Sequence, residues 1–281
     1  MQAGASSWTV CQSHEREATR RLRGAGLSSD IDRRRLRELH AWGDACPHAP
    51  AVLVLTAALE LVLLPEPSSD DLLAGLDELD RDLSTQRRRA LRRLRGAVVE
   101  SARRGEAPPS PAHYLIAYAS LGLGDLAGAQ AAVTASRARA EVEIWRLDRM
   151  EAFVALFRGD LPEALRLAHR SLEYATGSGR MSSMYTLAMA LDRAGSITAS
   201  RRILAQIRVR EGRDHAALDS LLPLHERLYL MAIEQEARGY EAAAKRLWTH
   251  YLERPEVEAP ERALAERRLA TLGGGPAVAG P

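Results

Sequence analysis

Four side chains in the first fifty residues are of the types that bind zinc. They are Cys11, His14, Cys46 and His48. Common zinc folds take their ligands in characteristic closely spaced pairs, and the stretches Cys-Gln-Ser-His and Cys-Pro-His do not match those spacings. We therefore predict no metal site. The two cysteines are also too few for a disulfide framework, and without a secretory signal pattern near the N-terminus they indicate a reducing, cytoplasmic location.

No catalytic constellation is recognisable in the rest of the chain. Most other histidines lie one per segment, at positions 113, 169, 215, 225 and 250, so no triad or paired-acid arrangement can be assembled from spacing. The glycine-rich stretch GLGDLAG lacks the lysine of a phosphate-binding loop. We predict that the protein is not an enzyme and uses no cofactor. A deep polar pocket with convergent titratable groups would instead indicate an enzyme with an unrecognised site.

The strongest charge feature is a run of arginines between residues 85 and 104, although the formal net charge of the chain is only +2. The basic patch in this run consists of Arg87, Arg88, Arg89, Arg92, Arg93 and Arg95. A basic amphipathic helix can bind nucleic acid or an acidic partner. The acidic segment 70–82 is expected to form a neighbouring helix, so a self-compensated, solvated pair of helices stays open as an alternative.

The elements that must position these residues are predicted to be helices. Alanine, leucine and arginine dominate and only 5% of residues are aromatic, which favours an all-α fold. The longest apolar run, from Ala49 to Leu64, is shorter than the roughly 20 residues that span a bilayer. It also contains Glu60. We interpret it as a buried helix and predict no association with a membrane.

Proline, glycine and loss of periodicity divide the chain. Residues 1–28 and 273–281 are predicted to be a disordered leader and a disordered tail. Residues 29–110 are predicted to form an N-terminal helical subdomain in which a new helix starts at Ser84, and Gly43-Asp44 could be the turn of a degenerate repeat. The segment Glu-Ala-Pro-Pro-Ser-Pro ends this subdomain, and residues 111–272 contain clearer repeats.

The repeats turn on glycines that recur about every 35 residues, at 124, 159 and 195. An alanine stands seven residues before each glycine, a leucine or isoleucine two after it, and an alanine or serine five after it. Glycine tolerates the left-handed conformation that ends a helix, and the small residues let two antiparallel helices approach closely. We predict helical hairpins that turn at Gly124, Gly159, Gly195 and Gly239 and stack into an α-solenoid.

At these residues the chain resembles the tetratricopeptide repeat (TPR) family, over roughly residues 111–255. In the fourth unit, Tyr240 takes the place of Leu126 and Ala243 that of Ala129. The unit also departs from regular spacing, because the segment before it is stretched. The resemblance implies an array of TPR-like hairpins whose first helices line a concave groove.

Such a groove commonly holds a protein or peptide partner. The groove candidates that the resemblance implies are Tyr114, Tyr118, Arg149, Phe153, Tyr185, Met189, Leu228 and Tyr229. Their alternative role is ordinary packing between helices. The expected function is a non-catalytic scaffold or adaptor in a bacterial-type regulatory assembly. A regulator that contacts nucleic acid through the arginine-rich helix 85–104 is the alternative.

Overall fold

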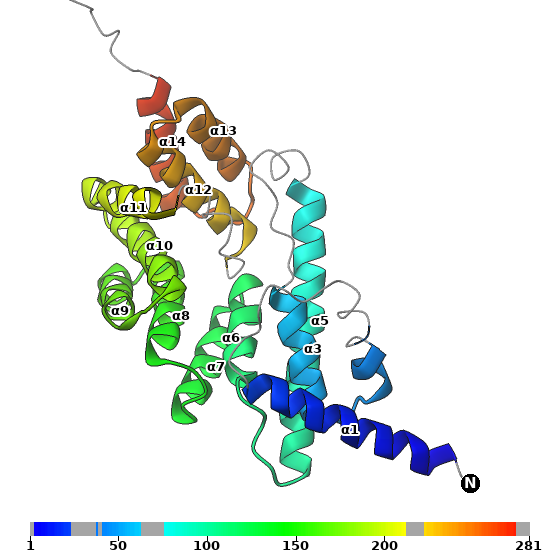
Figure 1. The fold of residues 1–281 in the computed structure, drawn as a ribbon. Coiled ribbons are helices and arrows are strands. Elements are labelled where there is room, and N and C mark those ends of the chain that lie inside the picture. Colours follow the sequence, from blue (N-terminus) through cyan, green and yellow to red (C-terminus); the bar gives the residue numbers. More distant parts are fainter. Residues whose placement is uncertain (1–2, 24–37, 39–40, 63–75, 212–221, 274–281) are drawn as a thin grey trace, which may run out of the picture.

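The computed structural model describes residues 3–23, 38, 41–62, 76–211 and 222–273, and in these residues the protein is all-α, with no strand (Figure 1). The N-terminal helices are α1 (Ala3–Arg23), α3 (Pro50–Val62) and α5 (Leu76–Arg103). Four helix pairs follow: α6 (Ala112–Gly122) and α7 (Leu126–Ala138), α8 (Ile144–Phe157) and α9 (Leu161–Tyr174), α10 (Ser178–Arg193) and α11 (Ile197–Glu211), α12 (Leu224–Arg238) and α13 (Glu241–Leu252). Helix α14 (Ala259–Gly273) packs on α13.

Each pair is an antiparallel hairpin, and successive hairpins pack on one another as an α-solenoid (Figure 1). The predicted turns are confirmed, because the turn glycines have φ of 74°, 76°, 82° and 77° at Gly124, Gly159, Gly195 and Gly239. At the first turn, Asp125 N donates to Ser120 O and Gly124 N donates to Leu121 O. The same two-bond pattern closes the other three turns. It satisfies carbonyls at the helix end that would otherwise lack a partner.

The residue after the glycine caps the second helix. The Asp125 side chain accepts a hydrogen bond of 2.8 Å from Gly128 N, and Asp160 accepts one of 3.3 Å from Glu163 N. Both aspartates are therefore N-caps, which satisfy a free N–H in the first turn of a helix. The repeated triplet Gly-Asp-Leu is thus a complete turn: one residue ends a helix, one caps the next and one begins it.

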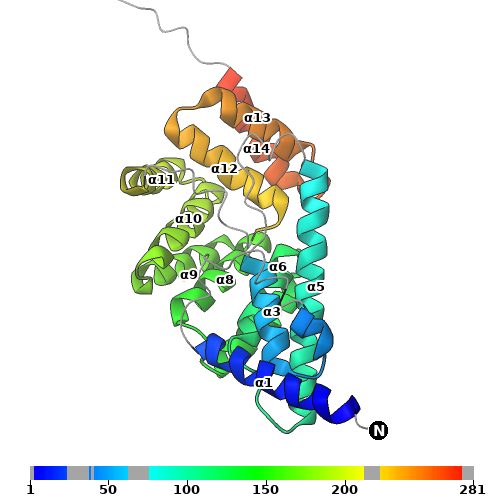
Figure 2. The ribbon, with the colours of Figure 1, turned by 45° about the vertical axis from the view of Figure 1, so that its right-hand side comes forward.

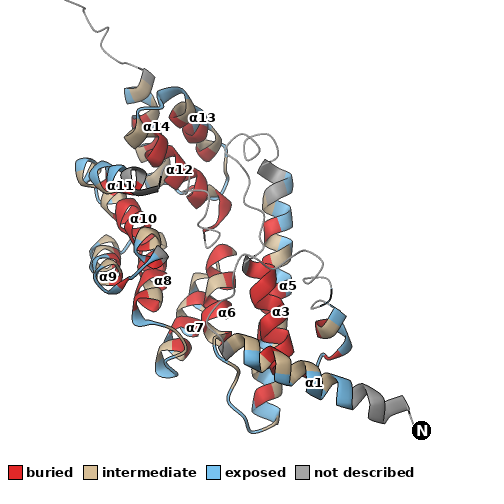
Figure 3. Cartoon of the chain, in the orientation of Figure 1, coloured by how far each residue is buried: buried red, intermediate tan, exposed pale blue. Residues whose placement is uncertain are grey.

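Small buried residues set the spacing within the hairpins. The alanine before each glycine and the small residue after it are at most 1% exposed at positions 117, 152 and 188 and at positions 129, 164 and 200. The first helices of the pairs are buried over most of their length, whereas α7, α9 and α13 bury one face each (Figure 3). The first helices therefore form the inner layer of the array.

Replacing Ala164 by leucine is expected to lower the free energy of unfolding by about 1–3 kcal/mol, because added methylenes cannot be accommodated in a close helix crossing. Ala164 is fully buried where α9 meets α8. Thermal unfolding followed by circular dichroism measures the change, with Ala127→Leu on the exposed face of α7 as the control. An Ala164→Leu midpoint equal to that of the wild type would contradict the close crossing.

The fourth unit differs from the predicted register by one residue. Tyr240 occupies the N-cap position and is 55% exposed, so it corresponds to Asp125 and not to Leu126. Ala244 is fully buried, whereas Ala243 is half-buried. The predicted equivalences of Tyr240 and Ala243 are wrong, because the left-handed glycine determines the register and the aromatic side chain does not.

The N-terminal part confirms one prediction and corrects two. Helix α3 is buried on every side from Pro50 to Leu61, as its continuous apolar sequence predicts. The described part of the acidic segment, residues 76–82, forms one helix with the basic segment and not two, because α5 runs without a break through Ser84. Residues 70–75 of the acidic segment lie outside the described residues. Gly43 is not a turn either, since residues 41–45 are helical. The proposed subdomain boundary at residue 110 stays a prediction, and α5 packs on α6 across it.

The predicted disordered leader is wrong for residues 3–23, which form α1 and pack on α3. Its remaining residues, and 274–281 of the predicted tail, lie outside the described part of the chain. A disulfide joins Cys11 of α1 to Cys46, a pairing that the expected reducing environment would disfavour. It arises from the tertiary structure, in which two residues 35 apart in sequence have Cα atoms only 5.5 Å apart.

Helix α5 ties the two ends of the array together (Figure 2). Arg254, which follows α13, lies 3.4 Å from Asp80 of α5. Arg87 is fully buried and donates to Gly122 O at 2.6 Å and to Leu222 O at 2.9 Å. Burial lowers the pKa of Arg87 to about 10, which leaves it charged at neutral pH. No described helix has the length and apolarity required to cross a membrane.

Candidate functional site

Most of the predicted groove residues lie inside the protein. The side chains that are at most 8% exposed are Tyr114, Arg149, Phe153, Tyr185, Met189, Leu228 and Tyr229, and Tyr118 is half-buried. A partner can contact very little of a side chain that is at most 8% exposed. The prediction that these residues line an open concave strip is therefore wrong for the seven buried residues.

These residues are instead partners of one another and of the helices behind them. The Tyr229 ring meets the edge of Trp248 at 5.2 Å between centroids and that of Tyr251 at 5.6 Å. Its hydroxyl donates to Asp192 at 2.6 Å. The Tyr185 hydroxyl donates to Glu234 at 3.0 Å. The alternative reading of packing between helices describes them better.

A buried ionic network joins α10, α12 and α14 beneath this layer. Arg193 lies 2.6 Å from Glu226 and 3.2 Å from Glu261, and its guanidinium stands 4.8 Å from the centre of the Tyr229 ring. Burial favours the neutral form of Glu226, but Arg193 and His225 together outweigh it and lower the pKa of this carboxyl. Burial raises the pKa of Glu261, and the positive charge of Arg193 offsets this increase only in part. The network holds the C-terminal helices in place.

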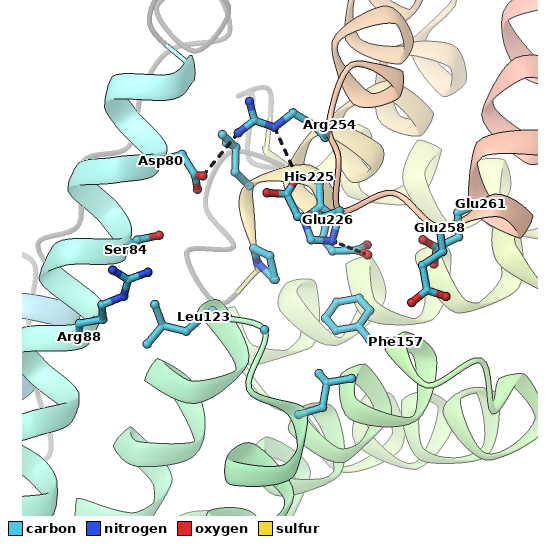
Figure 4. Close-up of a pocket in the computed structure, with 16 residues that line it drawn as sticks. Asp80, Ser84, Arg88, Leu123, Phe157, His225, Glu226, Arg254, Glu258 and Glu261 are labelled. Atoms are coloured by element: carbon cyan, nitrogen blue, oxygen red, sulfur yellow. Dashed lines mark hydrogen bonds and ion pairs between the residues drawn. The ribbon is translucent and has the colours of Figure 1, made fainter.

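A cavity of about 450 Å³ opens beside this network, between α5, the turn after α6 and the segment that joins α13 to α14 (Figure 4). Arg88 of α5 stands on one side, Glu258 and Glu261 on the opposite side, and Phe157 between them. The cavity is polar, which is the feature that would indicate an unrecognised enzyme.

The charged groups of this cavity are largely engaged with one another. Asp80 pairs with Arg254, and Glu226 pairs with Arg193. Among the described lining residues Ser84 is the sole hydroxyl, and it forms no hydrogen bond with His225. A nucleophile paired with a base is the arrangement expected of covalent catalysis, and this lining does not present one. The cavity therefore gives little support to catalysis.

The predicted basic patch is divided by the structure. Arg87 is buried, and Arg93 pairs with Glu60 of α3 and, at 3.0 Å, with Asp44. These two arginines hold the fold together. The exposed members of the patch are Arg88, Arg89, Arg92 and Arg95.

Three of the exposed arginines form a straight row with two further exposed residues. The row, which we call the arginine face, consists of Arg81, Arg88, Arg92, Arg95 and Val99. Steps of seven, four, three and four residues return to the same side of a helix, so the row extends about 27 Å along α5 at 1.5 Å per residue. Figure 3 shows exposed positions along this helix.

The charges of the arginine face are mostly uncompensated. Within the described residues no carboxylate lies within ion-pair distance of Arg81, Arg88 or Arg92. Arg95 stands 3.7 Å from Asp125, and both side chains are about half exposed, so this pair contributes little. Val99, at the end of the row, is 51% exposed. The face combines fixed positive charge with one apolar contact point.

Comparison with known proteins does not assign the chain to a family. No family model, no curated protein and no solved structure matches the chain. Within the described residues, no three histidine, cysteine or acidic side chains come together as metal ligands. The arginine face is therefore the candidate site that the geometry favours. The positions of its arginines at helical spacing are visible in the sequence, whereas the burial of Arg87 and the ion pairs of Arg93 are not.

Proposed function

We propose that the protein is a non-catalytic scaffold or adaptor of TPR-like hairpins that binds a protein partner as part of a regulatory assembly. The observation that carries this proposal is the arginine face, whose exposed arginines lie in one row on a helix that the rest of the fold anchors firmly. Arginine is enriched at protein interfaces, where its planar group forms paired hydrogen bonds with carboxylates. The proposed partner-binding surface is therefore on α5, and not on the first helices of the hairpins as the sequence predicts.

The neighbouring charges favour a protein over nucleic acid. Exposed acidic residues flank the face at Glu78 and Asp82, and Asp125 stands beside Arg95. A phosphate backbone is uniformly negative and would be repelled by these carboxylates. The exposed aromatic residues among those described, Tyr174 and Tyr240, lie on other helices, so no stacking platform accompanies the arginines. A partner helix with carboxylates in register and one apolar residue for Val99 fits the face.

The arginine face is expected to bind an acidic amphipathic helix and to lose it on charge reversal. The probe is a labelled helical peptide with glutamates at positions i, i+4 and i+7 and leucine at i+11, titrated in fluorescence anisotropy at low salt. The variant Arg88→Glu/Arg92→Glu/Arg95→Glu should bind at least about tenfold more weakly, because like charges then face each other. A duplex DNA probe is titrated in parallel.

The matched control is Arg202→Glu/Arg246→Glu/Arg267→Glu, which changes the same number of exposed arginines on α11, α13 and α14. It should bind the peptide as the wild type does. Tighter binding of the DNA probe, with a steep fall as salt rises, would favour the nucleic-acid alternative. Equal peptide binding by all three proteins would show that the face is not the site.

A further inference from the structure

We propose that the Cys11–Cys46 disulfide is a redox-sensitive latch, and that a dithiol reductant releases helix α1 from α3 and uncovers an apolar strip. The disulfide joins the first helix of the chain to the segment that leads into α3. This inference does not depend on the arginine face. It rests on how little else holds α1 in place.

The noncovalent packing of α1 is slight. Among its described residues only Ala18 is buried. Cys11 and Leu22 of α1 are partly buried and pack against the apolar clusters. Further contacts of α1 lie at the surface: Glu15 pairs with Arg104 at 3.1 Å, and His14 stacks on Trp42 with 4.1 Å between ring centres. Partly exposed ion pairs contribute little. A helix with so small a buried surface is held mainly by its covalent link.

The surface beneath α1 is apolar. Val52, Leu55 and Leu59 lie at helical spacing on α3, are at most 2% exposed, and form a cluster with Ala18 and Cys46. The opposite side of α3 belongs to the main core, to which α1 contributes the partly buried Leu22. Departure of α1 would therefore expose one apolar strip and leave the solenoid intact.

The two sulfur atoms differ in solvent exposure, and this difference determines which of them a reductant attacks first. Cys11 is half-buried, whereas Cys46 is 2% exposed. A thiolate of the reductant attacks Cys11 Sγ, the Sγ–Sγ bond breaks, and Cys46 leaves as a thiolate that takes up a proton. The second thiol of the reductant then closes its own disulfide and releases Cys11. The dithiol is oxidised by two electrons, and the protein gains two thiols.

The test is hydrogen exchange measured by mass spectrometry on the full chain, before and after treatment with a dithiol reductant. Reduction should speed exchange in α1 by at least about tenfold, because its opening is no longer coupled to α3. Exchange at Val52 to Leu59 should rise with it. Peptides from α6 to α13 should not change. Intact mass confirms the state, since the reduced chain is heavier by two hydrogen atoms.

The variant Cys11→Ser provides the matched control, because it breaks the link at the more exposed sulfur and leaves Cys46 in its buried site. It should show rapid exchange in α1 without reductant, and reductant should add nothing. The latch is excluded if α1 exchanges equally slowly in the oxidised and reduced chains. It is equally excluded if the protein keeps two free thiols in oxidising buffer.

Discussion

Replacing Phe153 by alanine is expected to destabilise the protein by about 3–5 kcal/mol, the usual effect of emptying a fully buried aromatic site. Phe153 is 0% exposed and packs between helices of the inner layer. Urea unfolding followed by circular dichroism measures the difference. The control is Tyr174→Ala, because Tyr174 is 55% exposed and its loss should change the free energy of unfolding by no more than about 0.5 kcal/mol.

The two substitutions separate a core residue from a surface residue. Had Phe153 been an exposed anchor of a groove, its truncation would leave folding nearly unchanged and weaken only partner binding. Equal stability of Phe153→Ala and Tyr174→Ala would therefore restore the open groove and contradict the buried inner layer.

Replacing Arg193 by methionine is expected to cost about 3–5 kcal/mol at neutral pH, because removing one member of a buried ion pair leaves the other charge uncompensated. The side chains of Arg193 and Glu226 are 4% and 3% exposed. Urea unfolding measures the cost. The exposed pair of Arg166 and Glu163 gives the control, and Arg166→Met should change stability by no more than about 0.5 kcal/mol.

The cost of Arg193→Met should depend on pH. In the wild type the pKa of Glu226 is lowered in the folded state, so the pair stabilises the protein above the unfolded value of 4.5 and this contribution is lost as pH falls. In the variant Glu226 is buried without its cation, and protonation relieves the penalty. The difference between the two proteins should therefore shrink below about pH 4. A difference that is constant from neutral to acidic pH would contradict the ion pair.

The turns of the solenoid could be predicted because the residues that determine each turn lie within the turn itself. Gly124 and Asp125 determine how one helix ends and the next begins, and neither depends on distant contacts. The register of the fourth unit is harder to predict, because Tyr240 resembles the apolar residue that begins a second helix, although it follows Gly239 directly and is the N-cap. The sequence does not reveal the continuity of α5, because Ser84 can cap a helix but does not have to break one.

The candidate site was less predictable because burial is a tertiary property. The sequence pattern places Phe153 on the first helix of a hairpin, but it does not show whether other helices cover that side chain. The packed structure shows that Phe153 is fully buried. In the same way Arg87 and Arg92 look alike in sequence, yet one is buried against two carbonyls and the other is exposed. The pairing of Cys11 with Cys46 likewise requires the approach of α1 to α3.

The most direct test of the proposed function is the affinity of a natural partner for the wild type and for the two triple arginine variants. The partner is first obtained by comparing what the wild type and Arg88→Glu/Arg92→Glu/Arg95→Glu retain from cells, and is then purified. Isothermal titration calorimetry at about 0.15 M salt measures each affinity. The account predicts at least about thirtyfold weaker binding by the arginine-face variant, since several central contacts become repulsive, and unchanged binding by Arg202→Glu/Arg246→Glu/Arg267→Glu. Equal affinity of the arginine-face variant and the wild type would contradict it.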